Sequence, residues 1–521
     1  MTIADQIQLV WFKRDLRIRD HAPLAHAAER GPVLPLYIAE PSVMHAPDFD
    51  PQHWTFIRES VIELRDQLAA LGQPLVVRVG EAIDVFAALR DLLGSFALWA
   101  HEETGNLLTF DRDKAVRRWC RANGIAFTEI APSGVVRGLR NRDDWAAQWE
   151  RRMQQPLTPA PDLIRPVPEV EIGLIPDHAA LAIGSDRREE TQPGGSAAAH
   201  RTLQSFLHDR GERYYRELSS PVTAWDSCSR ISPHLAWGTI SMREVVRATR
   251  DRSDALQHVP PAVQGTWPRT IRAFESRLHW HDHFVQKLER EPRIEWESFI
   301  PAYDAMRSDQ WSAERYEAWC AGQTGYPMVD ACMRALRATG YLNFRMRALL
   351  VSFAAYDLWL DWRGFHHFLA RQWRDYVPGI HLSQLQMQSG TTGINTIRIY
   401  NPIKQGQDHD PEGVFIKRWI PELAGVPDIF IHQPWVMTPT MQARHGCQIG
   451  RDYPLPIVDH TAAMQHARDR IIALRQQPEL REQAQQVLEV HGSRRGNDRT
   501  RRRGQTRRKP AQQALPIEAD A

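Results

Sequence analysis

The segment Thr324-Gly-Tyr-Pro-Met-Val-Asp-Ala-Cys-Met-Arg334 is followed by Asn343-Phe-Arg-Met-Arg347 and Asp361-Trp-Arg363. The first stretch predicts a turn and then a buried helix, and the second predicts another helix that carries two closely spaced arginines. Arginines presented among packed helices suit a large anionic cofactor. This region therefore predicts an all-α domain that holds such a cofactor.

The whole chain has 521 residues, 42% of them hydrophobic, and a formal net charge of +2. Its length allows about two to four domains, and its composition allows sizeable cores. Basic residues are nevertheless concentrated in 494–509, a stretch that contains nine Arg or Lys residues and a single aspartate. Such a run is typical of a disordered, solvated tail, which can still add salt-sensitive affinity for nucleic acid.

The five cysteines are scattered, and no CxxC pair occurs. This spacing disfavours a disulfide framework, a cysteine-built zinc site and a four-cysteine iron–sulfur cluster. We expect no metal site and a reducing, cytoplasmic location. The N-terminus shows no signal-peptide core, and no run of 18 apolar residues suggests a membrane span.

Apolar runs alternate with amphipathic segments over the first 135 residues, which predicts a parallel, Rossmann-like α/β sheet. The expected strands are Leu9–Phe12, Val33–Ala39, Pro74–Val79, Phe96–Ala100 and Phe127–Ile130, with helices at Trp54–Leu71, Ala82–Leu92 and Asp111–Ala122. From residue 200 onward the pattern is almost entirely helical. We therefore expect an α/β domain at 5–135, a linker at 136–199, a helical domain at 200–460 and a C-terminal extension at 461–521.

A candidate phosphate-binding loop lies in Trp225-Asp-Ser-Cys-Ser-Arg-Ile-Ser-Pro-His-Leu-Ala-Trp-Gly-Thr-Ile-Ser241, with Tyr214 upstream. Small hydroxyls and free amides at a helix start, beside Arg230, make a reasonable diphosphate cradle. Helix capping by Ser229 and Ser232 is the alternative explanation of the same residues.

A second candidate is the segment Arg277-Leu-His-Trp-His-Asp-His-Phe284. Its three alternating histidines allow a metal-dependent hydrolase as one hypothesis. The tryptophan between them and the single local carboxylate favour a stacking role for the segment instead.

The most specific pattern is Gly390-Thr-Thr-Gly-Ile-Asn-Thr-Ile-Arg-Ile-Tyr-Asn-Pro402, followed by Asp410-Pro-Glu-Gly-Val-Phe-Ile-Lys-Arg-Trp-Ile-Pro-Glu-Leu423. It resembles the closing signature of the photolyase/cryptochrome family nearly residue for residue. The segments described above are similar to that family's flavin helices, phosphate loop and lesion-facing helix. The resemblance covers about residues 5–135 and 200–425.

The resemblance implies an α/β antenna domain, a helical FAD-binding domain and UV-damaged DNA as the partner, with the chain acting as a monomer. It places Arg347 and Asp375 beside the flavin. The other residues expected to bind FAD are Tyr214, Cys228, Ser229, Arg230, Ile231, Ser232, Arg277, Trp280, His281, Phe284, Phe344 and Val377. The residues expected to bind DNA are Trp280, Arg277, Phe344, Arg345 and Arg398.

Several positions depart from the family pattern. Cys228 stands where the family has threonine, Arg277 replaces a glutamate that contacts the lesion, and His281 replaces an arginine. Val377 replaces a second aspartate.

The resemblance also implies a chain of tryptophans that reduces the flavin. Trp362 matches its middle member and Trp311 its outer member, so with the stacking residue Trp280 they form the expected catalytic set. The inner member should fall between Leu382 and Leu385, where no aromatic residue occurs. We expect photoreduction by another route, for which Trp373 and Trp280 are the candidates.

The resemblance leaves the reaction open between two functions. The first is a light-driven photolyase that repairs pyrimidine dimers, and the second is a cryptochrome-like photoreceptor. Phe344 and Ala348 occupy positions where (6-4) repair enzymes carry histidines, so cyclobutane dimers are favoured. The sequence assigns no type to a possible second, antenna chromophore: a deazaflavin, a flavin and an empty pocket are the alternatives.

Overall fold

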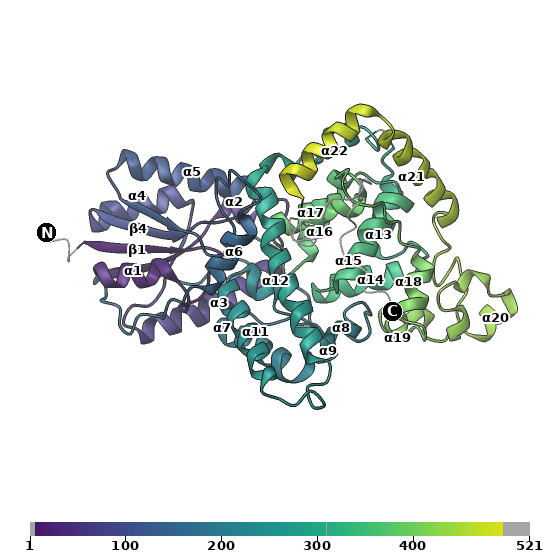
Figure 1. The fold of residues 1–521 in the computed structure, drawn as a ribbon, viewed down its shortest axis with the longest axis horizontal. Coiled ribbons are helices and arrows are strands. Elements are labelled where there is room, and N and C mark those ends of the chain that lie inside the picture. Colours follow the sequence, from purple (N-terminus) through teal and green to yellow (C-terminus); the bar gives the residue numbers. More distant parts are fainter. Residues whose placement is uncertain (1–5, 309, 493–521) are drawn as a thin grey trace, which may run out of the picture.

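The computed structural model describes residues 6–308 and 310–492. The basic tail predicted at 494–509 lies outside the described residues. The molecule has two parts, a sheet with flanking helices and a larger helical assembly, and the long helix α12 runs along the junction between them (Figure 1). No helix in the described ranges is both long and apolar enough to cross a membrane.

The N-terminal part is built on a five-stranded parallel sheet with the strand order β3-β2-β1-β4-β5. Its strands are β1 (Ile7–Phe12), β2 (Val33–Ala39), β3 (Val76–Val79), β4 (Phe96–His101) and β5 (Phe127–Ile130). In the register, Leu9 pairs with Leu34 on one side and with Leu98 on the other. β1, β2 and β4 are almost entirely buried because helices cover both faces of the sheet. All five predicted strands are thus confirmed.

The helices of this part are α1 (Ala22–Arg30), α2 (Pro41–Met44), α3 (Pro51–Ala70), α4 (Ala82–Leu93), α5 (Leu107–Ala122) and α6 (Trp145–Gln154). α3 starts where Asp50 accepts a hydrogen bond from the Gln52 amide and Pro51 occupies the first turn. This start places the first turn of α3 beside the helical part of the protein.

The helical part begins at α7 (Ser196–Ser205). It continues through α8 (Tyr214–Glu217), α9 (Ala224–Ser227), α10 (Ser232–Ala236), α11 (Met242–Gln257), α12 (Trp267–Arg290), α13 (Ala313–Ala321), α14 (Pro327–Thr339), α15 (Phe344–Ser352), α16 (Trp362–Gln372), α17 (Pro378–Ser389), α18 (Pro402–His409), α19 (Val414–Trp419) and α20 (Pro439–Arg444). Two further helices, α21 (His460–Arg475) and α22 (Pro478–His491), lie across its outer side (Figure 1).

Shorter helical segments complete this part: the π-helical η2 (Phe206–Arg210) and η5 (Phe353–Asp357), and the 3-10 turns η3 (Pro292–Glu295), η4 (Pro301–Tyr303), η6 (Pro421–Leu423), η7 (Asp428–Phe430) and η8 (Pro434–Val436). The buried helix predicted from the opening segment is α14, which starts at Pro327 and ends at Gly340 in a left-handed conformation with φ of 70°. Ten of its residues are buried, so it is a core helix of this part.

Side chains of the N-terminal part join the two parts by binding the backbone at the end of α16 and just after it, and Trp237 at the C-terminal end of α10 binds the same stretch. Gln52 Nε2 donates to the carbonyl of Arg371 over 2.6 Å, His53 Nε2 to that of Trp373 over 2.9 Å, and Trp237 Nε1 to that of Arg374 over 2.9 Å. The segment that carries Asp375 is therefore fixed from both sides.

Candidate functional site

The loop before α10 is folded around Arg210. The guanidinium of Arg210 donates to the carbonyls of Asp226 and Ser229, over 2.7 Å in each case, and also to that of Cys228. Because these carbonyls turn toward Arg210, the half-buried side chains of the loop are left to face another partner. Arg230 adopts φ of 57°, a strained conformation for an arginine.

Arg230 is held between two aromatic rings. Its guanidinium carbon lies 3.6 Å from the ring centre of Trp225 and 4.4 Å from that of Tyr341. Gln192 accepts from Nε over 3.1 Å. No carboxylate within the described residues forms an ion pair with this guanidinium, so its charge is available to an anionic ligand such as a diphosphate.

Arg347 on α15 and Asp375 form a two-pronged ion pair. Nη1 and Nη2 donate to the two carboxylate oxygens over 3.0 and 2.9 Å. Burial alone would raise the pKa of Asp375, but the charge of Arg347 and a hydrogen bond from Ser232 hold that pKa below its ordinary value. The other face of Arg347 covers the ring of Trp373 at 4.3 Å. The pair is thus ionised and rigidly oriented.

Four residues expected at the site, Arg277, Trp280, His281 and Phe284, share one face of α12. Their spacing places them on consecutive turns, and all four are half-buried, whereas the intervening Leu278, His279, Asp282 and His283 are buried. The rings of Trp280 and Phe284 stack at 5.7 Å with an angle of 28°. This half-buried stripe inside a helical assembly is the surface on which a large planar ligand can lie.

The stripe on α12 faces α8 and the start of α15. Arg277 is hydrogen-bonded to the buried Tyr214 and lies 5.8 Å from the ring of Phe344. The structure therefore brings Tyr214, Arg277 and Phe344 together, as it does Ser232, Arg347 and Asp375.

The remaining predicted residues are more dispersed. Ile231 is buried in a hydrophobic cluster with Tyr214, and Val377 packs against the core of the N-terminal part. Arg345 and Arg398 are half-buried. Neither of them, nor Arg277, forms an ion pair with a carboxylate among residues 6–308 and 310–492.

The histidines of the α12 segment have separate partners. His279 packs against Trp145 and Trp149 at 4.9 and 5.0 Å, His281 bonds to Asp282 over 3.1 Å, and His283 bonds to Arg142. Because their rings are committed to different neighbours, they do not form a shared metal-binding face.

The predicted electron-transfer tryptophans lie on and beside α16. Trp362 is buried, and its Nε1 donates to Ser298 Oγ over 3.1 Å. Trp311 is 42% exposed and packs against Gly364, two residues after Trp362. The positions between Leu382 and Leu385 carry no aromatic ring, so the gap predicted from the sequence remains in the fold.

Sequence reasoning missed three residues of this region: Arg210, Tyr341 and Tyr376. Tyr341 touches both Arg230 and Trp225, and it precedes the quoted segment Asn343–Arg347 by two positions, a signal that was readable. The role of Arg210 is evident only in the folded structure, from the backbone carbonyls that it binds. The role of Tyr376 is evident only from a contact across the junction of the two parts, where its hydroxyl donates to Asp48.

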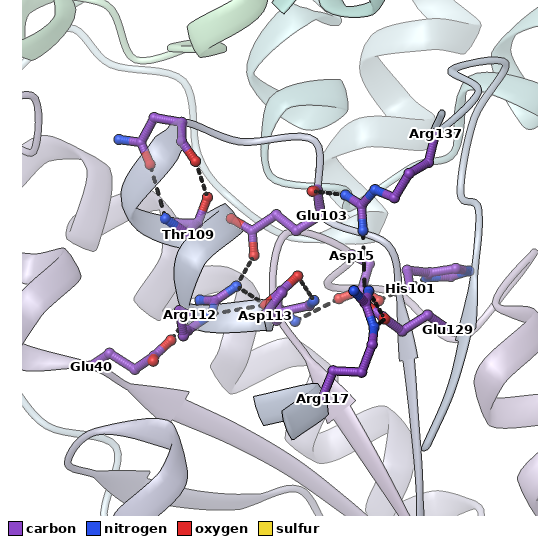
Figure 2. Close-up of polar contacts among 12 residues, drawn as sticks. Asp15, Glu40, His101, Glu103, Thr109, Arg112, Asp113, Arg117, Glu129 and Arg137 are labelled. Carbon is purple, nitrogen blue, oxygen red and sulfur yellow. Dashed lines mark hydrogen bonds and ion pairs between the residues drawn. The ribbon is translucent and has the colours of Figure 1, made fainter. Parts of the chain in front are cut away.

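A cleft between the two parts opens beyond the ends of β1 and β2. Its apolar walls include Trp11, Tyr37, Phe49, Trp237 and Tyr376. On one side Arg112 is bonded to Glu40 over 2.6 Å, to Glu103 over 2.5 Å and to Asp113 over 2.8 Å (Figure 2). Lys13 also pairs with Asp113, at 2.9 Å. Arg112 and Lys13 are therefore already paired with carboxylates, whereas Arg14, which also lines the cleft, donates to the backbone carbonyls of Ala236 and Tyr376.

A buried cluster of Asp15, His21 and His101 lies at the ends of β1 and β4, where the strand order reverses. Asp15 Oδ2 accepts from His21 over 2.9 Å and from His101 over 2.8 Å. A metal-bound histidine donates its second ring N–H, yet His21 Nδ1 accepts from the Leu24 amide. Burial lowers the pKa of His101 to about 3. The cluster is a carboxylate between two neutral imidazoles that braces this edge of the sheet.

Comparison with known proteins gives the same two parts. Residues 8–159 match the family model described as DNA photolyase, and residues 274–473 match the FAD binding domain of DNA photolyase. A cryptochrome DASH of Gloeobacter violaceus is 30% identical over 479 residues, covering 87% of this chain and 93% of that protein. A deoxyribodipyrimidine photo-lyase of Halobacterium salinarum is 30% identical over 492 residues, covering 88% and 98%.

A solved structure agrees with these sequence matches. The archaeal photolyase of Sulfolobus tokodaii, whose crystal structure holds two FAD molecules, superposes with a TM-score of 0.73 at 26% identity, covering 90% of this chain and 100% of that one. A parallel α/β sheet joined to a helical domain with an Arg–Asp pair at its site is the architecture of a two-domain flavoprotein. The chain belongs to the photolyase/cryptochrome family, and its helical part is the FAD-binding domain of that family.

Proposed function

We propose that this protein is a blue-light-driven, FAD-dependent DNA photolyase that repairs UV-induced pyrimidine dimers, with cyclobutane dimers as the favoured substrate. The observation that carries the proposal is the half-buried stripe of Arg277, Trp280, His281 and Phe284 next to the Arg347–Asp375 pair. One face of α12 can then meet both a flavin and an extruded base.

The residues of the site fit FAD. Arg230 and the hydroxyls of Ser229 and Ser232 provide donors for a diphosphate, and no carboxylate of residues 6–308 or 310–492 pairs with Arg230. The Arg347–Asp375 pair provides a fixed charge beside a flavin ring. When bound and reduced, FAD supplies the light-driven electron that splits a pyrimidine dimer.

The chain's own residues bind and orient the lesion. Trp280 is a half-buried ring on which an extruded base can stack. Arg277, Arg345 and Arg398 lack carboxylate partners among the described residues, so their charges can be neutralised by DNA phosphates. Phe344 offers no proton to the lesion, and this favours the cyclobutane dimer over the (6-4) product, whose repair requires proton transfer.

A photoreceptor role is the second candidate. It is favoured by the lack of an aromatic residue between Leu382 and Leu385, where the inner tryptophan should be. It is also favoured by Arg277, which is bonded to Tyr214 although its position should face the lesion. It is also in keeping with the cryptochrome DASH among the relatives.

A repair assay separates the two functions. Chemically reduced holoprotein is illuminated with blue light in the presence of an oligonucleotide that contains one cyclobutane dimer, and in parallel with one that contains one (6-4) product. We expect restored pyrimidines from the first substrate only, and none in the dark. Bound FAD without repair of either substrate contradicts the photolyase proposal and supports the photoreceptor.

A matched pair of variants tests the DNA contact. Arg345→Met should weaken binding to the damaged duplex and reduce its salt dependence by about one phosphate contact. Arg451→Met serves as the control, because Arg451 is exposed and already paired with Asp452 at 2.9 Å. Equal effects of the two changes would contradict the proposed DNA-facing surface.

We further propose that the cleft beyond β1 and β2 receives the antenna chromophore. Its apolar walls suit a ring system, and two of its cations, Lys13 and Arg112, are already paired with carboxylates. Extraction of the purified protein and mass spectrometry of what is released test the proposal.

We also propose that the protein works as a monomer in the cytoplasm, with the division of 5–135, 136–199, 200–460 and 461–521 expected from the sequence. All five cysteines are free thiols, which agrees with a reducing compartment. Sedimentation of the holoprotein with and without damaged DNA tests the oligomeric state.

A further inference from the structure

Tyr376 is a buried tyrosine whose hydroxyl is bonded to a carboxylate of the other domain. The hydroxyl donates to Asp48 Oδ2 over 2.8 Å, and the residue is 7% exposed. The same oxygen accepts from Asn106 Nδ2 over 3.0 Å, so it is held facing the phenol. Burial and the charge of Asp48 raise the pKa of Tyr376 well above its ordinary value. The resting pair is therefore a neutral phenol beside a proton acceptor.

This arrangement makes Tyr376 easier to oxidise than an unpaired tyrosine. A phenol that loses an electron becomes a strong acid, and a buried radical cation is costly unless its proton leaves. Asp48 is already within hydrogen-bond distance to take that proton as a general base does. Tyr37 lines the same cleft, but Glu40 and Glu103 affect it only through their charge.

Tyr376 also adjoins the flavin-binding pair. It follows Asp375 directly, and while Asp375 bonds to Arg347 in the helical domain, Tyr376 reaches to the opposite side. Its ring packs edge-on against His381 at 5.4 Å. One peptide unit thus connects the proposed redox side chain to the carboxylate that orients the flavin partner.

The neighbouring aromatic residues are poorer donors. Trp373 lies under the guanidinium of Arg347 at 4.3 Å, and a positive charge at that distance opposes removal of an electron from the ring. Trp362 is separated from Tyr376 by the rings of His366 and His381. Burial lowers the pKa of His366 to about 2 and that of His381 to about 3, so both are neutral imidazoles, which are hard to oxidise.

We propose that Tyr376, with Asp48 as its proton acceptor, is the residue that gives an electron to the photo-excited oxidised flavin in place of the missing inner tryptophan. One electron leaves the phenol for the bound flavin, and the phenolic proton moves to Asp48 Oδ2. The products are a neutral tyrosyl radical, a protonated Asp48 and a flavin reduced by one electron. A thiolate in solution then returns one electron to Tyr376 and becomes a thiyl radical, while Asp48 returns the proton to the phenol.

The test uses the FAD-loaded full chain with the flavin oxidised. Samples are illuminated with blue light and frozen, and their electron paramagnetic resonance spectra are compared. We expect a neutral tyrosyl signal that is lost in Tyr376→Phe and falls at least about tenfold in Asp48→Asn, since an amide accepts a hydrogen bond but takes no proton. Tyr37→Phe, the matched variant in the same cleft, should retain the signal.

Two outcomes overturn the proposal: a tryptophanyl radical in the unmodified protein, or a tyrosyl signal that survives Tyr376→Phe. The flavin absorbance of each variant confirms that FAD is still bound, so a lost cofactor cannot imitate a lost donor. The proposal rests on FAD binding and not on the repair substrate. Repair by chemically reduced, unmodified protein therefore tests the proposed function independently of the electron donor.

Discussion

The substitution Asp375→Asn tests whether the Arg347–Asp375 pair supports the flavin site. An asparagine keeps the shape of the side chain but offers one oxygen and no charge to Arg347, which now binds both carboxylate oxygens at 3.0 and 2.9 Å. Removing one partner of a buried ion pair costs about 3–5 kcal/mol. Because 26% of the Arg347 side chain is exposed, water recovers part of this loss, and we expect about 2–3 kcal/mol.

The pH dependence gives this prediction a second signature. The folded-state pKa of Asp375 lies below its unfolded value, so the carboxylate contributes its full stability above the unfolded pKa of about 3.9. That contribution is lost as the pH falls through the lower, folded value. The difference in unfolding free energy between the native protein and Asp375→Asn should be constant from pH 5 to 8, about 2–3 kcal/mol, and should shrink in stronger acid.

Urea unfolding of both proteins without FAD measures this difference, and a titration with FAD measures the affinity. A misdirected Arg347 should weaken FAD binding by about tenfold, or 1.4 kcal/mol. Asp408→Asn is the control, since Asp408 forms an exposed pair with Lys404 at 3.0 Å, worth about 0.5 kcal/mol. A loss in Asp375→Asn no larger than in this control, or one that grows in acid, refutes the reasoning.

Three further substitutions have defined outcomes. Trp280→Ala should weaken binding of dimer-containing DNA by about 1–3 kcal/mol in fluorescence anisotropy while changing the affinity for undamaged duplex little. Lys287→Met should stabilise the protein in thermal or urea unfolding. Burial and the charge of Arg142 lower the pKa of Lys287 to about 7, so the gain should be about 4 kcal/mol at pH 7 and about half that at pH 9. Gly238→Ala should destabilise the protein far more than Gly124→Ala: both glycines have positive φ, but only at Gly238 would a Cβ clash with a backbone oxygen, 2.2 Å away.

The centre of the sheet could be predicted because its buried parallel strands are continuous apolar runs, and Val33–Ala39 was expected with the bounds that the structure shows. The edge strand Phe127–Ile130 also has the expected bounds, although it is only partly buried and contains Thr128 and Glu129. Helix starts were less accurate. α5 was expected from Asp111 but begins at Leu107, where the preceding Asn106 caps the helix by accepting from the Thr109 amide. A capping asparagine directly after a glycine is easily taken for a loop.

The helix α6 was not predicted at all. It lies in the stretch expected to be a linker, and its Trp145 and Trp149 are buried against α12. Trp149 Nε1 and the Gly134 amide both bond to Asp282, over 2.9 Å in each case. Such a helix is stabilised by partners more than 100 residues away. The composition of the local sequence does not indicate these partners.

The candidate site shows the same division between local and distant information. The residues of the stripe on α12 and the pairing of Arg347 with Asp375 both came from resemblance and not from spacing. The fold then places positions 277, 280, 281 and 284 on one face of the helix. Contacts across the domain junction could not be predicted, since Asp48, the partner of Tyr376, lies 328 residues away in the sequence.

The segment between α16 and α17 contributes side chains both to the flavin-binding domain and to the cleft between the two parts. His53 and Trp237 bind its carbonyls, and Gln52 binds that of Arg371 at the end of α16, so no side chain of the segment takes part in these bonds. Its side chains are therefore free to face different partners: Asp375 binds Arg347 in the flavin domain, and Tyr376 binds Asp48 beside the cleft. In the proposed electron transfer Tyr376 passes from a neutral phenol to a neutral radical, and the charge that disappears is that of Asp48. Because hydrogen bonds to backbone carbonyls hold the segment, this loss of charge acts on Asp375 through the electrostatic field.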